Sequence, residues 1–169
     1  VLHTTQYLDR LIKEGKLRLN KGFTSCVTYH DPCNLGRKSE MYIPWKGIEK
    51  KVLGQFILRE PEKVIHRGWN GVYEPPRDII RSVPGIKFVE MERTKEYSWC
   101  CGAGAGVKQY LDDFAIWTAS ERLAEAKSVG AEAIVTACPW CERNFKDAIA
   151  ASGDDILVYD VVELVKRAM

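Results

Sequence analysis

Short apolar segments with the composition of β-strands alternate with helical segments over most of this 169-residue chain. Strands are predicted at 25–30, 85–91, 131–137 and 155–160. Helices are predicted at 107–130 and 139–151, from 161 onward, and from the Pro75–Pro76 pair. Each crossover between parallel strands needs a helix on one face of the sheet, so this alternation is typical of parallel α/β proteins. We therefore predict an α/β fold with a mostly parallel sheet flanked by helices.

Two helices carry further expectations. The helix at 107–130 ends at Gly130 and has large apolar residues at helical spacing. We expect the following of these residues to pack on the core: Val107, Tyr110, Leu111, Phe114, Trp117 and Leu123. We interpret residues 1–20 as a linker helix, with Leu8, Leu11 and Ile12 on one face and an end near Gly15. Because the sequence begins on valine inside this helix, we expect it to be a piece of a longer polypeptide or a processed subunit.

Residues 21–169 are interpreted as one domain, with an insertion at about 38–77 that does not follow the strand–helix alternation. The insertion holds four of the seven prolines of the chain and several large aromatic residues next to glycines. We expect a long irregular loop with one short helix.

Charge and hydropathy exclude several classes of function. Lysines and arginines exceed acidic residues by only two, which does not favour binding to nucleic acid or to an anionic membrane surface. The chain has no run of about 18 apolar residues that would predict a membrane span. Its first residues do not follow the pattern of a signal peptide.

Five of the six cysteines lie shortly after predicted strands. Cys33 follows the first strand, the Cys100–Cys101 pair follows the second, and Cys138 and Cys141 follow the third. The carboxyl ends of parallel strands meet at one edge of a sheet, where ligands bind, so we expect these five thiols to converge there. The sixth, Cys26, lies inside a strand and is interpreted as a small buried apolar residue. Clustered cysteines without a secretion signal indicate metal ligands or redox thiols of a reducing compartment.

The spacing of these cysteines suits a metal centre. Cys138-Pro-Trp-Cys141 places two sulfurs on one helical turn. Side chains of adjacent residues diverge, so Cys100 and Cys101 reach different atoms and suit a cluster better than a single ion. The glycines at 102, 104 and 106 let backbone amides approach an anionic centre closely.

Simpler interpretations of the same residues are a thioredoxin-like dithiol and a structural zinc site with four cysteines. The glycine loop at 102–106 also suggests nucleotide binding, but its spacing departs from G-x-G-x-x-G. His30 and His66 lack a second histidine at ligand spacing and are interpreted as structural. Four tryptophans are candidates for gating access to the site, although ordinary packing is the simpler role: Trp45, Trp69, Trp99 and Trp140.

These cysteines in this order resemble the cysteine-rich CCG domain of heterodisulfide reductase B and D subunits, which is related to glycolate oxidase iron–sulfur subunits. The likeness lies in "YHDPCNLGR" around Cys33, "CCG" at 100–102 and "TACPWCERNF" around Cys138 and Cys141. The 36 residues between Cys101 and Cys138 fit the family. The 66 residues between Cys33 and Cys100 exceed its usual gap, and Asn34 stands where relatives often have histidine.

The resemblance implies that Cys33, Cys100, Cys101, Cys138 and Cys141 ligate a [4Fe–4S] cluster, which is noncubane in the best-understood relatives, with a cubane cluster or zinc as alternatives. It implies an oxidoreductase subunit that passes electrons to a disulfide or another two-electron acceptor. A relay between a flavoprotein or 2-hydroxy-acid oxidase and quinone, and a non-catalytic zinc docking domain, remain alternatives. Expected partners are iron–sulfur or flavin subunits and a quinone-reactive membrane subunit, with no nucleic acid. The expected location is the cytoplasm, including the inner face of a membrane complex.

Overall fold

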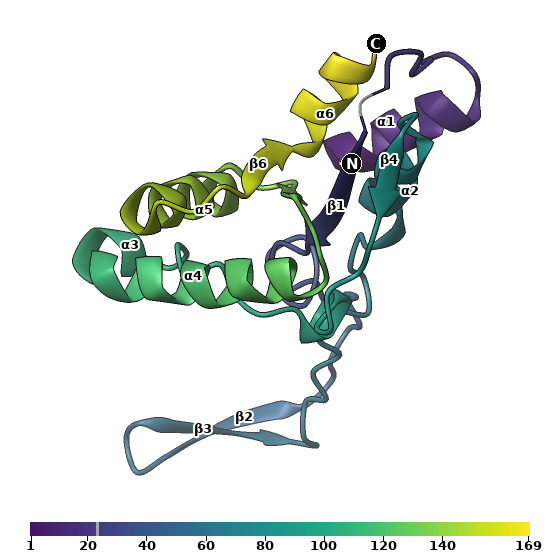
Figure 1. Ribbon diagram of the computed structural model, residues 1–169. Helices are drawn as coiled ribbons and strands as arrows, with labels where there is room; N and C mark the ends of the chain where they lie inside the picture. Colours follow the sequence, from purple (N-terminus) through teal and green to yellow (C-terminus); the bar gives the residue numbers. More distant parts are fainter. Residues whose placement is uncertain (23) are drawn as a thin grey trace.

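The computed structural model describes residues 1–22 and 24–169, so Phe23, inside the predicted domain, lies outside the described part. Its centre is a four-stranded sheet in the order β4-β1-β5-β6, with every neighbouring pair parallel (Figure 1). The strands are β1 (Ser25–His30), β4 (Ile86–Phe88), β5 (Ala133–Thr136) and β6 (Leu157–Asp160). Each lies inside or on a segment predicted as a strand, and the α/β fold is confirmed.

Helices cover both faces of the sheet. On one face, α1 (Thr4–Lys13), α2 (Glu74–Ser82) and α6 (Val161–Ala168) pack against Val27, Tyr29 and Val135. On the other, α4 (Asp112–Ser128) and α5 (Pro139–Ser152) pack against Ile134 and Val158. Prolines occupy the first turns of α2 and α5, where a missing N–H leaves no hydrogen bond unmade. The result is a three-layer arrangement with an apolar core on each side of the sheet.

In the structure, the helix predicted at 107–130 is interrupted, and it buries a different face from the one expected. It breaks at Leu111, which separates the short α3 (Val107–Tyr110) from α4. Leu123 is buried as expected, but four residues assigned to the core face are exposed and that assignment was wrong: Tyr110, Leu111, Phe114 and Trp117. The face that packs instead holds alanines 115, 119 and 126. Small side chains let the backbones of α4 and α5 approach closely, which outweighs the burial of the larger residues.

The carboxyl edge of the sheet has a crevice between β1 and β5. The chain leaves β1 toward α2 on one face and leaves the adjacent β5 toward α5 on the opposite face. The ends of the strands are level, because His30 pairs with Thr136 and Thr136 pairs with Asp160. Neighbouring strands whose connections diverge in this way form the usual ligand site of open α/β sheets.

The insertion at 38–77 contains an antiparallel hairpin, β2 (Ile48–Val52) and β3 (Phe56–Glu60), which extends away from the sheet (Figure 1). The predicted short helix was wrong, since helical structure in the described residues resumes only at Glu74. No residue of either strand is buried. A one-turn 3-10 helix, η1 (Lys95–Tyr97), precedes the cysteine pair. None of the helices in the described ranges is long and apolar enough to cross a bilayer.

Candidate metal centre

Three connections at the carboxyl edge bring the five predicted site cysteines together. Cys33 lies in the turn after β1, Cys100 and Cys101 lie in the connection from β4 to α3, and Cys138 and Cys141 begin α5 after β5. Neighbouring thiols shift one another's pKa in the order Cys33, Cys100, Cys101, Cys141, Cys138, so the five form one contact series. All six cysteines, Cys26 included, are free thiols. The predicted convergence of three distant segments is therefore present.

A pocket of about 270 Å³ opens beside these thiols. Four of the five cysteines line it, together with Trp140 and the glycine loop at 103–106. Since one water occupies about 30 Å³ of liquid, the space corresponds to about nine waters. A zinc ion within about 2.3 Å of four sulfurs would not require such a volume. The pocket therefore suits a group larger than one ion.

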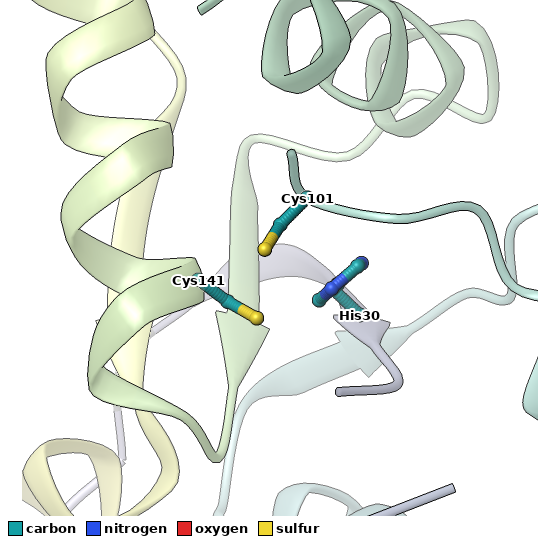
Figure 2. Close-up of side chains that lie close together, drawn as sticks. All are labelled: His30, Cys101 and Cys141. Atoms are coloured by element: carbon teal, nitrogen blue, oxygen red, sulfur yellow. The ribbon is translucent and has the colours of Figure 1, made fainter. Parts of the chain in front are cut away.

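His30, at the end of β1, was interpreted as structural but lies against the thiols. A ring nitrogen of His30 and the Sγ atoms of Cys101 and Cys141 all lie within 4.8 Å of one another (Figure 2). Burial lowers the pKa of His30, and the charge of Arg122 lowers it further, so the ring is neutral. Arg122 Nε donates to His30 Nδ1 at 3.3 Å, which places the ring proton on Nε2. The position of His30 directly at a strand end is the signal that could have identified it.

Cys100 has the most strongly lowered pKa of the five thiols. Its pKa lies far below the usual value because it accepts hydrogen bonds from Cys101 and Cys33. The backbone N–H of Gly102, at 3.4 Å from its sulfur, and the charge of Arg37 lower the pKa further. The pKa of Cys33 is raised, because its thiol donates to Cys100. The site is thus built to hold negative charge on sulfur.

The start of α5 provides a second anionic position. A hydrogen bond from Cys141 and the backbone N–H groups of Cys141 and Trp140 lower the pKa of Cys138 to about 6. The pKa of the donor Cys141 is raised, and that of Cys101 is raised to about 11 because it donates to Cys100. The pKa is thus lowered at Cys100 and Cys138 and raised at the three thiols that lie beside them, Cys33, Cys101 and Cys141. Binding of a cationic metal centre would displace the remaining thiol protons, as metal–thiolate bonds require.

The loop after the cysteine pair approaches α4 closely. Gly102 has φ = +86°, and a Cβ built there would lie 2.6 Å from the carbonyl oxygen of Ala115. Asn144, fully buried on α5, donates from Nδ2 to the carbonyl oxygens of Cys101 at 2.5 Å and Ala115 at 2.9 Å. One amide side chain thus joins the cysteine loop, α4 and α5. An asparagine inside an amphipathic helix has no sequence signal that would predict this role.

Buried ion pairs fix the segment that leads into Cys100. Arg77 on α2 is fully buried and contacts both carboxylate oxygens of Asp31 at 2.7 and 2.8 Å. Burial lowers the pKa of Arg77, but hydrogen bonds with Asp31 and Glu90 outweigh it and raise the pKa overall. The same Asp31 carboxylate accepts from the backbone N–H of Lys95 at 2.8 Å. The carboxylate of Asp31, two residues before Cys33, therefore holds the segment that leads to Cys100.

Two further arginines converge on Ser98, two residues before Cys100. Arg37 donates to the Ser98 carbonyl oxygen at 2.5 Å, and Arg122 donates to its hydroxyl at 3.1 Å. Arg122 is buried and pairs with Glu125 at 2.5 Å, and Glu125 also accepts from the backbone N–H of Arg93 at 2.8 Å. These charges stabilise one conformation of the loop, since a buried charge that lost its partner would be costly. None of these residues was identified from the sequence.

The remaining sequence candidates lie in different places. Cys26 is half-buried at the other end of β1, away from the thiol series. Trp140 lines the pocket, and Trp99 packs under the guanidinium of Arg93 at 4.0 Å. Trp45 and Trp69 line separate surface pockets and do not line the cysteine pocket. Of the four tryptophans, only Trp140 stands at its mouth.

Comparison with known proteins adds the family. The family model of the CCG cysteine-rich domain matches residues 64–146, a span that includes four of the five site cysteines, with Cys33 before it. The chain is 38% identical, over all of its length and 34% of the relative's, to the D subunit of the dihydromethanophenazine:CoB--CoM heterodisulfide reductase of Methanosarcina acetivorans. It is 32% identical over its full length, and 20% of the relative's, to the "Probable iron-sulfur-binding oxidoreductase FadF" of Bacillus subtilis. The "EtfAB:quinone oxidoreductase" of Syntrophomonas wolfei is 30% identical over the same shares.

The family match identifies residues 64–146 as a CCG cysteine-rich domain, and the parallel α/β fold and the cysteine-bearing edge of the sheet agree with it. The chain spans about a third of the length of the Methanosarcina relative and a fifth of the other two. The relatives' names, heterodisulfide reductase subunit, iron–sulfur-binding oxidoreductase and quinone oxidoreductase, support an iron–sulfur redox role associated with an oxidoreductase. The ligand set and the cluster type stay predictions.

Proposed function

We propose that this chain is the iron–sulfur module of a heterodisulfide-reductase-like oxidoreductase. Cys33, Cys100, Cys101, Cys138 and Cys141 would ligate a [4Fe–4S] cluster of the noncubane type. The observation that carries the proposal is the contact series of five thiols from three segments beside a pocket of about 270 Å³. Five cysteines exceed the four that a structural zinc site uses, and two of them are adjacent.

The chain's own groups suit an anionic cluster. When bound, such a cluster exchanges single electrons with neighbouring redox groups. The N–H of Gly102 and the guanidinium of Arg37 stabilise negative charge at Cys100, and the N–H groups at the start of α5 do so at Cys138. Asn144, the half-buried Arg37 and the buried Arg122 hold the three cysteine segments in place. A protein sets the reduction potential of a bound cluster through hydrogen bonds to the cluster sulfurs and through nearby charge.

The pocket supplies a route for the electron acceptor. Beyond the cysteines it is lined by the small residues of the glycine loop, Asn34, Gln109 and the half-exposed ring of Trp140. We propose a disulfide or another two-electron acceptor as the substrate class. The name of the Methanosarcina relative, a heterodisulfide reductase subunit, supports the disulfide. The Syntrophomonas relative's name favours a second candidate, an electron relay toward a quinone.

The proposed setting follows from these relatives. Residues 21–169 would form the CCG domain and residues 1–20 its linker helix. Partners would be other iron–sulfur or flavin subunits of a redox complex, one of them quinone-reactive, in the cytoplasm or at the inner face of a membrane complex. No observation suggests nucleic acid as a partner.

The first test is the iron and acid-labile sulfide content of protein purified without oxygen. We expect iron and sulfide in equal amounts, and Mössbauer and EPR spectra to separate noncubane from cubane clusters. Cys101→Ser and Cys141→Ser should lower the iron content severely. Cys26→Ser, the matched control at the other end of β1, should leave it unchanged. Stoichiometric zinc without sulfide would contradict the proposal.

A second measurement separates the two acceptors. Protein with a full cluster and an artificial one-electron reductant should reduce small disulfides if the disulfide is the substrate class. Reduction of a soluble quinone alone, with no disulfide turnover, would instead support the relay.

A further inference from the structure

The hairpin in the insertion has no role in the cysteine site. We call residues 47–61, with β2 and β3, the arm. It stands clear of the sheet and its helices (Figure 1). Hydrogen bonds close its base, from Gly68 N to the Ser39 carbonyl at 2.7 Å and from Trp45 Nε1 to the Pro61 carbonyl at 3.0 Å. Beyond them every residue of both strands is exposed. An isolated two-stranded hairpin is marginally stable in water, so an arm of this kind requires an explanation.

Apolar side chains are concentrated at the tip of the arm. In the register of the hairpin, Val52 faces Phe56 and Lys51 faces Ile57, so the two pairs lie on opposite faces. Leu53 stands in the turn. The exposed fractions are 41% for Val52, 85% for Leu53, 64% for Phe56 and 56% for Ile57. The tip therefore exposes apolar side chains on both faces and in the turn, with Gln55 as the polar residue of the turn and Lys51 opposite Ile57.

Charged residues are arranged along the arm by sign. The acidic residues lie on the half nearer the base, in the cross-strand pairs Glu49–Arg59 at 2.8 Å and Lys50–Glu60 at 2.5 Å. Between residues 50 and 58 the charged side chains are Lys50 and Lys51 alone. Lys51 has no ion-pair partner among the residues that the structure describes. Lys50 thus lies behind the tip and Lys51 lies level with Ile57, and no carboxylate stands between residues 50 and 58.

We propose that the tip of the arm inserts into the interface of an anionic lipid membrane. A groove on a protein would cover one face of the hairpin and leave Leu53 or Ile57 in water, whereas immersion covers both faces and the turn. Strand residues rise about 3.4 Å each, so Lys50 lies roughly 7 Å behind Val52. Interfacial segments bury their apolar residues about 5–10 Å deep, which places both lysines at the level of the lipid phosphates. The small net charge of the whole chain does not oppose this, because lipid attraction depends on charge near the surface.

Vesicle binding tests the proposal independently of the cluster. Protein purified without oxygen is mixed with vesicles of phosphatidylcholine alone or of phosphatidylcholine with phosphatidylglycerol, and the bound fraction is measured by flotation. We expect binding to the anionic vesicles. Leu53→Asp/Phe56→Asp should weaken it at least about tenfold, because two large apolar side chains no longer leave water. Lys50→Gln/Lys51→Gln should reduce the preference for anionic vesicles, by about fivefold for each lysine at the surface.

The matched control is Leu2→Asp/Val162→Asp, which removes two exposed apolar residues and adds the same charge outside the arm. It should bind vesicles like the unmodified protein. Iron content and circular dichroism of every variant establish that it is folded, so loss of vesicle binding with full iron concerns the arm alone. The proposal is overturned if the unmodified protein binds no vesicles or if the tip variant binds as well. Self-association that the tip substitutions abolish, without vesicle binding, would instead assign the tip to a protein partner.

Discussion

The ion pairs at the carboxyl edge of the sheet are buried, whereas those of the arm are exposed to solvent. At the edge, arginines 77 and 122 have no exposed surface and bind carboxylates that water does not reach freely. In the arm, Glu49–Arg59 and Lys50–Glu60 are ion pairs of similar length between half-exposed side chains. Ion pairs of equal length therefore contribute differently to stability in the two regions, because solvent screens the pairs of the arm and not those of the edge. The buried pairs therefore hold the side chains and loops around the proposed cluster in one conformation. The exposed pairs of the arm impose no such constraint.

The largest effect expected from this contrast is that of removing a buried arginine. Arg77→Met leaves the Asp31 carboxylate buried without its partner and should lower the free energy of unfolding by about 3–5 kcal/mol. Arg59→Met, its counterpart in the arm, should change it by less than about 1 kcal/mol. Urea unfolding of both iron-free variants measures the difference. Equal destabilisation by the two substitutions would mean that burial does not distinguish these regions.

Glycines with positive φ provide the next comparison. Gly102 (φ = +86°) meets the Ala115 carbonyl, whereas Gly54 in the arm (φ = +71°) has open space where a Cβ would lie. Gly54→Ala strains the left-handed backbone by about 1–2 kcal/mol, but the free energy of unfolding should change by less than about 1 kcal/mol, because the arm can open locally without unfolding the sheet. Gly102→Ala adds a backbone clash, so we expect about 2–4 kcal/mol and a loss of bound iron. Full iron content in Gly102→Ala would argue that the loop can move away from α4 without harm.

Asn144 tests how much one buried side chain contributes to the edge. Asn144→Leu removes the donors to the Cys101 and Ala115 carbonyl oxygens and should cost about 1–3 kcal/mol. Iron should be lost faster to a chelator in this variant, since Cys101 is no longer anchored to α5. Gln109→Leu, a substitution at the pocket wall outside this network, is the control. If both variants release iron at the rate of the unmodified protein, Asn144 has no part in holding the site.

The smallest effect is expected from removing the arm. Replacing residues 44–63 by a short Gly-Ser loop keeps the bond from Gly68 N to the Ser39 carbonyl and removes no residue of the two core clusters. Iron content and the urea midpoint should remain within error of the unmodified protein. A marked loss of either would show that the arm supports the sheet edge after all.

The sequence predicts the cysteine edge well and the arm poorly, for physical reasons. Cys33, Cys100 and Cys138 follow buried strands, and the ends of parallel strands must meet, so their convergence follows from the alternation of elements. The arm buries no core, so its strands lack the one-sided apolar pattern that identifies a strand from sequence.

Tertiary packing decided the features that sequence patterns missed. Phe114 and Trp117 are spaced like a core face, yet alanines on the other side of α4 allow the closer contact with α5. Arg77 and Asp31 are 46 positions apart, and no local pattern marks such a pair. His30 was visible as a strand-end residue, but its distance to two thiols depends on the crossing of β1 with α5.

The arm lies between Cys33 and Cys100, inside the longer of the two chain loops that a shared metal centre would close. These loops contain 66 and 36 residues. Loop-closure entropy grows only with the logarithm of length, so the longer loop costs about 0.5 kcal/mol more to close than the shorter one. An arm inserted into this loop therefore adds little to the cost of closing the loop at the metal centre. Such a metal centre would therefore leave this chain free to lengthen, shorten or exchange its outward extension while the strand ends remain tied together.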